Sequence, residues 1–426
     1  MLKYTQAYTM FKEMIADGRL RRGERMPSIR RAAELYRISR TTVQNAYFQL
    51  AAEGYIYAKP QSGYFVAGGP KAPAAPMPRP QVQTPPRLDL TGNSADLSSF
   101  DFSLWQRYIK SALRQRLLTY SEPQGEYDLR CALADYVRER RNVVTAPEHI
   151  VVGAGVQMLL EILCVLLKGR RTVSFPDGSF VQGSTVFAAH GYTVRTRYKD
   201  ADIIYVSPSH MNRQGDVMPI QRRLELCAHS ADTGAVVIED DFENDFLYSS
   251  TPTPSLYALG SGNVVYMGAF SALLLPGIRI SFMVLSPALA AAYHQMKDTF
   301  AQTASKTEQI ALCAYLRDGN MKSRTKKIRR LYTGKAKTLC TLLAKALPDH
   351  PVRVGENGLQ VQIETPMLPD SAPFEQAGLA LYIVKEKSGK NIVVVSPSAV
   401  PADRLEEAAH AVAAALYKAE EAAKAK

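Results

Sequence analysis

The chain has 426 residues, of which 46% are hydrophobic and 22% charged, and its formal net charge is +12. This length predicts two or three domains, and the composition is that of a globular protein, which excludes a disordered or fibrous chain. The sequence contains no run of 18 apolar residues and no secretory signal pattern, so we expect a cytoplasmic protein without a membrane span. The five cysteines are scattered without a CxxC pair, which disfavours a disulfide framework or a metal site.

Half of the excess positive charge lies in the first sixth of the chain. Residues 1–70 contain 11 Lys and Arg against 5 Asp and Glu. A basic segment of this kind suggests a polyanionic partner, most simply nucleic acid. A solvated basic face would have the same composition.

Three helices and a strand pair are predicted before residue 67. The second and third helices begin after Ser28 and Ser39, which can cap them. Residues 55–57 and 64–66 then flank the turn-rich segment 59–63, which predicts a β-hairpin. This order is typical of a winged helix-turn-helix, although a small helical interaction domain with a hairpin would show the same periodicity.

The polar face of the third helix carries side chains of the kind that contact DNA. Arg40, Thr41 and Gln44 lie in its first turns, where a recognition helix enters the major groove. We expect Arg40 to anchor a phosphate and Gln44 to read a base edge.

Residues 18–66 resemble the DNA-binding domain of GntR-type regulators over nearly their whole length. The shared landmarks are Gly18-Arg19-Leu20, Gly23, Pro27-Ser28, Arg30, Ser39-Arg40, Thr42-Val43, Ala46-Tyr47, Leu50, Glu53-Gly54 and Ser62-Gly63. The resemblance implies that Arg30 also contacts the operator and that the wing near Gly63 reaches the minor groove. The candidate DNA-binding residues are therefore Arg30, Ser39, Arg40, Thr41, Thr42, Gln44, Lys59 and Gly63.

Seven prolines within residues 67–86 predict an extended, semi-rigid spacer. This spacer separates a DNA-binding domain, residues 1–68, from the body of the chain. We place the linker itself at residues 69–86.

Short apolar runs alternate with helical stretches in the body. This pattern is typical of an α/β fold with a mostly parallel sheet covered on both faces. Functional groups in such sheets cluster at the carboxyl ends of the strands. Residues that follow the apolar runs are therefore candidates for a pocket, and they include Gly155, Val156, Gln157, Asn212, Asp240, Ser271 and Arg279. The amides of residues 155–157 open a helix and suit a phosphate.

In order and spacing these segments resemble the fold-type-I pyridoxal phosphate (PLP) enzymes. More closely, they resemble the aminotransferase-like domain of MocR-type regulators, a GntR subgroup; residues 120–137 fit that group through Gly125, Leu129 and Arg130. The resemblance implies a large aminotransferase-like domain, residues 87–320, and a smaller αβ subdomain, residues 321–426. It also implies a homodimer that binds two half-sites of double-stranded operator DNA.

Three departures from the family pattern bear on catalysis. The family motif Thr-Phe-Ser-Lys supplies the lysine that bonds PLP, but here that position is Ala272 and residues 269–278 contain no lysine. Phe242 replaces a tyrosine that binds the ring hydroxyl, and the C-terminal strand, residues 391–397, lacks an arginine for a substrate carboxylate. A Schiff base needs a primary amine, so we expect no catalytic residue and no covalent cofactor. Ala272 alone could be an engineered change, whereas three departures together favour natural loss.

Other pocket positions persist. By the resemblance, Asp240 would pair a pyridine nitrogen, Ser271 and Arg279 would hold a phosphate, Phe180 would stack on the ring and Asn212 would face its hydroxyl. Such a pocket could bind PLP non-covalently or another anionic effector, although local hydrogen bonds or ion pairs also explain these residues. The sequence therefore predicts a catalytically inactive, DNA-binding transcriptional regulator. The alternatives are a working PLP aminotransferase fused to a DNA-binding domain and a DNA-binding scaffold that senses no ligand.

Overall fold

The computed structural model describes residues 3–67, 87–113, 117–241, 244, 254–260, 262–367, 369–385 and 389–424. The chain divides into two compact units, Met1–Thr84 and Pro85–Lys426, and each is described by itself. The predicted linker at residues 69–86 and the predicted pocket residue Phe242 lie outside the described residues.

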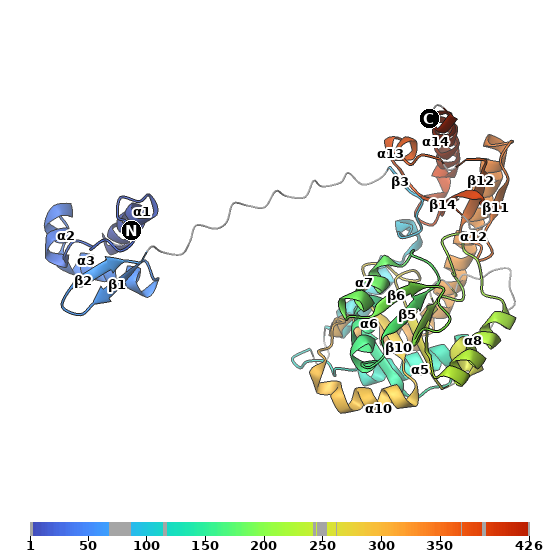
Figure 1. Ribbon diagram of the computed structural model, residues 1–426, viewed down its shortest axis with the longest axis horizontal. Coiled ribbons are helices and arrows are strands. Elements are labelled where there is room, and N and C mark those ends of the chain that lie inside the picture. The colour runs from blue at the N-terminus through green and yellow to red at the C-terminus, as the bar shows by residue number, and fades with distance from the viewer. Residues whose placement is uncertain are drawn as a thin grey trace. The chain divides into compact units, whose positions relative to one another are not determined.

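In its described residues the N-terminal unit is a winged helix-turn-helix (Figure 1). Its elements are helices α1 (Lys3–Ala16), α2 (Ile29–Tyr36) and α3 (Arg40–Ala52) and the antiparallel strands β1 (Ile56–Lys59) and β2 (Gly63–Val66). As predicted, serines cap two of the helices: Ser28 Oγ accepts from the backbone N–H of Arg31 at 3.2 Å, and Ser39 Oγ accepts from that of Thr42 at 3.1 Å. Apolar side chains from all five elements meet in one core, so the unit has its own stabilising centre.

The main sheet of the C-terminal unit has the order β4-β10-β9-β8-β7-β5-β6 in the described part of the chain. These strands are β4 (Ile150–Gly153), β5 (Thr172–Phe175), β6 (Thr193–Thr196), β7 (Ile203–Val206), β8 (Val236–Asp240), β9 (Val264–Ala269) and β10 (Ser281–Val284). Neighbouring strands from β6 across to β9 are parallel, whereas β10 is antiparallel to both β4 and β9. The predicted α/β class with a mostly parallel sheet is confirmed.

Helices cover both faces of this sheet. They are α4 (Phe102–Ala112), α5 (Tyr127–Arg141), α6 (Val156–Leu166), α7 (Val181–Ala189), α8 (Ile220–Thr233), α9 (Leu256–Leu259), α10 (Pro287–Met296), α11 (Lys306–Arg317) and α12 (Asn320–Ala346). Successive strand residues point to opposite faces, so Ile150 and Val152 pack in a cluster with α4, α5 and α11, whereas Val151 packs in a second cluster with α6, α7 and α10. None of the helices in the described ranges is long and apolar enough to cross a lipid bilayer.

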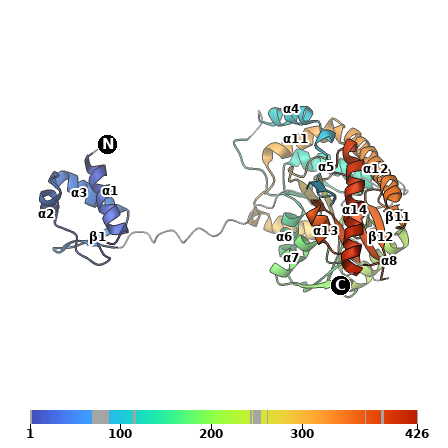
Figure 2. The same cartoon turned by 90° about the horizontal axis from the view of Figure 1, so that it is seen from above.

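A smaller antiparallel sheet, in the order β11-β12-β15-β14, forms the C-terminal subdomain. Its strands are β11 (Val352–Val354), β12 (Val361–Thr365), β14 (Tyr382–Lys385) and β15 (Asn391–Val395), and the helices α13 (Ala372–Gln376) and α14 (Leu405–Lys424) pack with it. The C-terminal subdomain has its own hydrophobic cluster, called the C-terminal cluster below. Helix α12 links it to the main sheet, because Ile328 packs in the first cluster of that sheet and Leu339 packs in the C-terminal cluster. Helix α14 packs against α12 (Figure 2).

The segment that opens the described body also joins the C-terminal subdomain. Strand β3 (Leu88–Asp89) pairs in parallel with β13 (Leu379–Ala380), and Leu88 and Leu90 are buried in the C-terminal cluster. The structure therefore differs here from the expected large domain, residues 87–320. A contact between segments this far apart in sequence leaves no local periodicity that would predict it.

Candidate functional site

The exposed face of α3 presents the polar side chains that the sequence singled out. Arg40, Thr41 and Gln44 are exposed, whereas Val43 and Tyr47 on the opposite face are buried. The side chains of Ser39 and Thr42 are bonded to each other, with 2.8 Å between their hydroxyl oxygens. These two residues thus fix the start of the helix, while Arg40, Thr41 and Gln44 project into solvent.

Two further cations were predicted at this surface. The guanidinium of Arg30 lies 3.2 Å from Glu34 Oε1, one helical turn away, and both side chains are mostly exposed. Such an exposed pair contributes little to stability, so Arg30 can exchange Glu34 for a phosphate at little cost. On the wing, Lys59 Nζ lies 4.9 Å from the centroid of the Phe65 ring.

Arg25 is a candidate residue that the sequence reasoning missed. A Cβ at Gly63 would lie 3.7 Å from the Arg25 guanidinium, and the backbone of Arg25 forms an isolated antiparallel β-bridge with Phe65 of the wing. Gly63 has φ +94°, a left-handed conformation that favours glycine. The structure therefore places an exposed cation beside the wing tip. In the sequence, Arg25 is one of several arginines in a turn-rich segment, and nothing there relates it to the wing.

A cavity of about 600 Å³ opens at the carboxyl ends of the parallel strands. It is lined by seven of the residues predicted for the pocket, namely Gly155, Val156, Gln157, Phe180, Asp240, Ser271 and Arg279. They come from four separate segments that the chain topology brings to one edge of the sheet. The C-terminal subdomain supplies another wall, through Gln360, Tyr382, Val394 and Ser396.

Arg279 and the start of α6 form the cationic end of this cavity. Gly155 precedes α6 with φ +94°, and a Cβ there would lie 2.5 Å from Arg279 Nη2. A side chain at residue 155 would therefore displace the guanidinium from the helix N-terminus. Free backbone N–H groups and a cation at one point make a favourable position for a phosphate. Ser271 lines the same cavity.

Asp240 lies at the end of β8 and is almost fully buried. The phenolic hydroxyl of Tyr205, on the adjacent strand β7, donates a hydrogen bond to Asp240 Oδ2. Burial, and then the neighbouring Asp240 carboxylate, raise the pKa of Tyr205 well above its usual value, so the tyrosine keeps its proton. Phe180 stacks on the Tyr205 ring with centroids 5.3 Å apart and planes inclined by 30°. Phe180 thus gives the cavity an aromatic wall that rests on Tyr205.

A buried ionic cluster holds the end of β8 in place. Asp241 accepts from Arg141 Nε at 2.8 Å and from the Tyr266 hydroxyl at 2.7 Å. Glu239 accepts from the backbone N–H groups of Leu256 and Tyr257, and burial, together with the Asp241 carboxylate, raises the pKa of Glu239. These bonds fix the strand end and therefore the position of Asp240.

Two predicted pocket positions lie elsewhere in the structure. Asn212, expected to face a ring hydroxyl, does not line this cavity: its Nδ2 donates to Asp216 Oδ2 at 2.7 Å, and its Oδ1 accepts from the Gln214 N–H at 3.1 Å. The amide is engaged in closing its own loop, a local alternative open to every asparagine in a turn.

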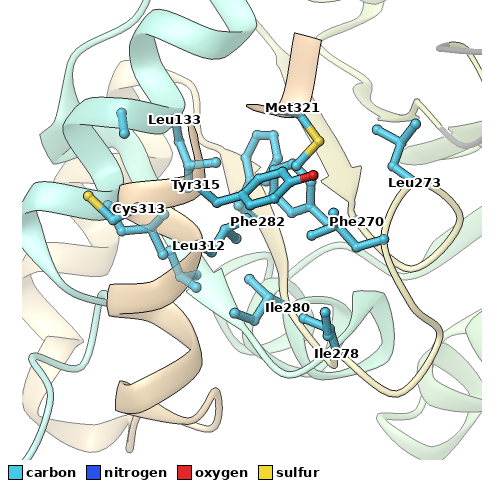
Figure 3. Packing of buried hydrophobic residues seen from close by; sticks show 14 of the residues in the cluster. Leu133, Phe270, Leu273, Ile278, Ile280, Phe282, Leu312, Cys313, Tyr315 and Met321 are labelled. Carbon is cyan, nitrogen blue, oxygen red and sulfur yellow. The ribbon is translucent and has the colours of Figure 1, made fainter. Parts of the chain in front are cut away.

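Ala272 also lies outside the cavity lining and packs against the first core cluster. Figure 3 shows Phe270 and Leu273, which are close to Ala272 in sequence, in that cluster together with Tyr315 and Met321. Among the described residues no lysine lines the cavity, and the undescribed residues 242, 243 and 245–253 include none in their sequence.

The sequence reasoning also missed Arg213, which lines the cavity with its guanidinium carbon 3.8 Å from the centroid of the Tyr382 ring. Asn93 Nδ2 donates to the Tyr382 hydroxyl at 3.0 Å. These three residues belong to segments far apart in the chain, so no local motif could have united them.

Comparison with family models divides the chain at the same place. Residues 3–66 match the bacterial regulatory proteins of the gntR family, and residues 93–402 match the aminotransferases of class I and II. The second match covers most of the chain, so the body is an aminotransferase-like domain.

Curated relatives share both parts. An uncharacterized HTH-type transcriptional regulator, YhdI of Bacillus subtilis, is 35% identical over 384 residues, which cover 84% of this chain and 82% of the relative. The probable rhizopine catabolism regulatory protein MocR of Rhizobium meliloti is 28% identical over 398 residues, covering 84% of this chain and 80% of the relative.

Among solved structures, an archaeal alanine:glyoxylate aminotransferase matches with a TM-score of 0.70 at 20% identity, covering 78% of this chain and 91% of that one. At this identity the likeness concerns the fold of the body. The chain therefore belongs to the GntR family of transcriptional regulators and is a MocR-like, DNA-binding member in which a helix-turn-helix domain is joined to a domain of the aminotransferase class I and II family.

Proposed function

We propose that the aminotransferase-like body of this regulator recognises a small anionic effector and forms no covalent bond with it. The observation that carries this proposal is the alanine at residue 272, together with a cavity wall whose described residues include arginines but no lysine. Transamination on PLP requires a primary amine on the protein. An arginine binds anions but cannot supply that amine at neutral pH.

The residues of the cavity fit part of PLP and not all of it. Arg279 and the start of α6 suit a phosphate, and Asp240 suits a protonated pyridine nitrogen. The covalent anchor is missing, because Ala272 has no amine; its side chain is partly buried and packs against the first core cluster. The effector class supported by these groups is a phosphorylated, flat molecule held by charge and stacking alone, which includes non-covalent PLP.

The DNA-binding roles of individual residues belong to the same proposal. Arg30 and Arg40 anchor phosphates, Thr41 and Gln44 face the major groove, and Lys59 and Gly63 belong to a wing that reaches the minor groove. A homodimer of the body would bring two such units to two operator half-sites. Effector binding would then alter operator affinity through the coupling between the units.

Titration calorimetry with PLP as the probe tests the ligand-binding part. Replacement of Arg279 by alanine removes a charged hydrogen-bond donor, so affinity should fall by about 10- to 100-fold. The control is Arg222→Ala, since Arg222 is exposed, pairs with Glu225 and lies outside this cavity. Equal affinity of the Arg279→Ala variant would reject the assigned phosphate position, and a wild-type protein that binds no PLP and no other phosphorylated ligand would support the scaffold alternative.

A further inference from the structure

A second guanidinium without an ion-pair partner among the described residues lines the cavity, at the wall contributed by the C-terminal subdomain. The Arg213 guanidinium lies over the ring of Tyr382 of β14, with its central carbon 3.8 Å from the ring centroid. A cation over an aromatic face is attracted by the ring and keeps the N–H groups of its edge directed outward. Tyr382 is itself held, because its hydroxyl accepts from Asn93. Arg213 is therefore fixed in place without being neutralised by a carboxylate of the described residues.

The charge balance of the cavity leaves both arginines without an acidic partner in the described part of the chain. Its acidic lining residues are Asp177 and Asp240. Asp177 Oδ1 accepts from the backbone N–H of Ser179 at 2.8 Å, and Asp240 accepts from Tyr205. Neither Arg213 nor Arg279 forms an ion pair with any described residue. Two cations in one cavity, Arg213 half-exposed and Arg279 exposed, favour a ligand with two anionic groups.

The walls between these cations indicate the shape of that ligand. Phe180 covers one wall, and Val394 of β15 and Ser396 just after the strand present small side chains without charge. An aminotransferase-like body was expected to carry an arginine for a carboxylate on that C-terminal strand. Here the strand lacks one, and Arg213 supplies a guanidinium to the same cavity from the loop that follows β7.

We propose that Arg213, supported by Tyr382, is the carboxylate-binding residue of this protein, so that the effector carries a carboxylate on Arg213 as well as a phosphate on Arg279. The planar fork of a guanidinium matches a carboxylate in two parallel hydrogen bonds, which explains why an arginine rather than a lysine suits this position. This inference rests on the proposed function, because it assigns a second anchor within the same effector cavity.

Two probes, one with a carboxylate and a leucine side chain and one with neither, test the assignment. N-(5'-phosphopyridoxyl)-L-leucine carries a phosphate, a pyridine ring and a carboxylate, whereas pyridoxamine 5'-phosphate lacks the carboxylate; neither needs a lysine to bind. In calorimetric titrations of the full chain, the wild type should prefer the carboxylate probe by about 10-fold or more. Arg213→Ala should abolish this preference and leave the affinity for pyridoxamine 5'-phosphate unchanged, and Arg213→Lys should restore only part of it.

Matched controls keep the outcomes separate. Arg222→Ala removes an arginine outside the cavity and should leave the preference intact, and thermal unfolding of each variant checks its fold. Equal binding of both probes by the wild type, or a preference that survives Arg213→Ala, overturns the carboxylate assignment while the phosphate-binding cavity stands. Failure of both probes to bind the wild type overturns the cavity proposal itself, and with it this inference.

Discussion

Tyr205 and Asp240 are joined by a hydrogen bond between neighbouring parallel strands, at the point where both strands end in the cavity wall. Tyr205 thereby satisfies one oxygen of a buried carboxylate and also supports the Phe180 ring. The tyrosine thus links the polar and the aromatic parts of the cavity.

Replacement of Tyr205 by phenylalanine should destabilise the body. The change keeps the ring but removes the donor to a buried carboxylate, which costs about 1–3 kcal/mol. Chemical denaturation followed by circular dichroism measures this effect. Tyr198→Phe is the matched control, because Tyr198 is exposed; an equal loss in both variants would contradict the role assigned to the Tyr205 hydroxyl.

The double replacement of Arg40 and Gln44 by alanine should weaken operator binding without unfolding the N-terminal unit, since both side chains are exposed. Loss of one base contact costs about 1–3 kcal/mol, and loss of one phosphate contact lowers the salt dependence of binding by about one unit. Gel-shift titrations at several salt concentrations measure both quantities. Arg19→Ala removes a charge that is paired with Asp17 in the same unit and should have a smaller effect; unaltered affinity of the double variant would exclude this face as the reading surface.

Replacement of Lys335 by methionine should destabilise the body by about 3–5 kcal/mol, because it leaves a buried carboxylate without its cation. Lys335 Nζ donates to Asp96 Oδ2 and to the carbonyl oxygen of Val400, both at 2.6 Å, and both charged side chains are almost fully buried. Lys326→Met, on an exposed position of the same helix, is the control. A loss below about 1 kcal/mol, the range of surface pairs, would show that this contact is not a buried ion pair in solution.

The same pair predicts a pH dependence. Although burial alone raises the pKa of Asp96, the hydrogen bonds from Lys335 and Ser98 outweigh it and lower that pKa below its usual value. The stabilisation is therefore complete above the pKa of about 3.9 of an unfolded aspartate and is lost as the pH falls through the lower pKa of the folded protein. The difference in unfolding free energy between the wild type and Asp96→Asn should shrink below about pH 4; a difference that grows on acidification would contradict the sign of the shift.

Local features of the fold were predictable from sequence, and contacts between distant segments were not. Ser28 and Ser39 cap their helices as expected, because a cap depends on residues only three positions apart. The mostly parallel sheet followed from apolar runs that alternate with helices. Leu88, by contrast, packs in the C-terminal cluster. Its strand β3 pairs with β13, which lies almost 300 residues further along the sequence.

The candidate cavity shows the same division. Gly155 follows β4, Asp240 ends β8 and Arg279 lies between β9 and β10, and all three line one cavity. The Asn212 side chain instead forms hydrogen bonds within its own turn. The motif spacing shared with the family does not show whether such local bonds replace a contact with a ligand. Arg213 was missed because its partner Tyr382 belongs to another subdomain, and sequence spacing carries no information about that approach.

The most direct test is to incubate the purified full-length protein with PLP, reduce it with borohydride and map modified peptides by mass spectrometry. Reduction traps any imine between the cofactor and a lysine as a stable amine. An effector cavity that binds by charge and stacking, without a covalent bond, predicts no single lysine modified in near-stoichiometric yield. One lysine carrying the phosphopyridoxyl group in every molecule, and losing it when that lysine is replaced by arginine, would contradict the account.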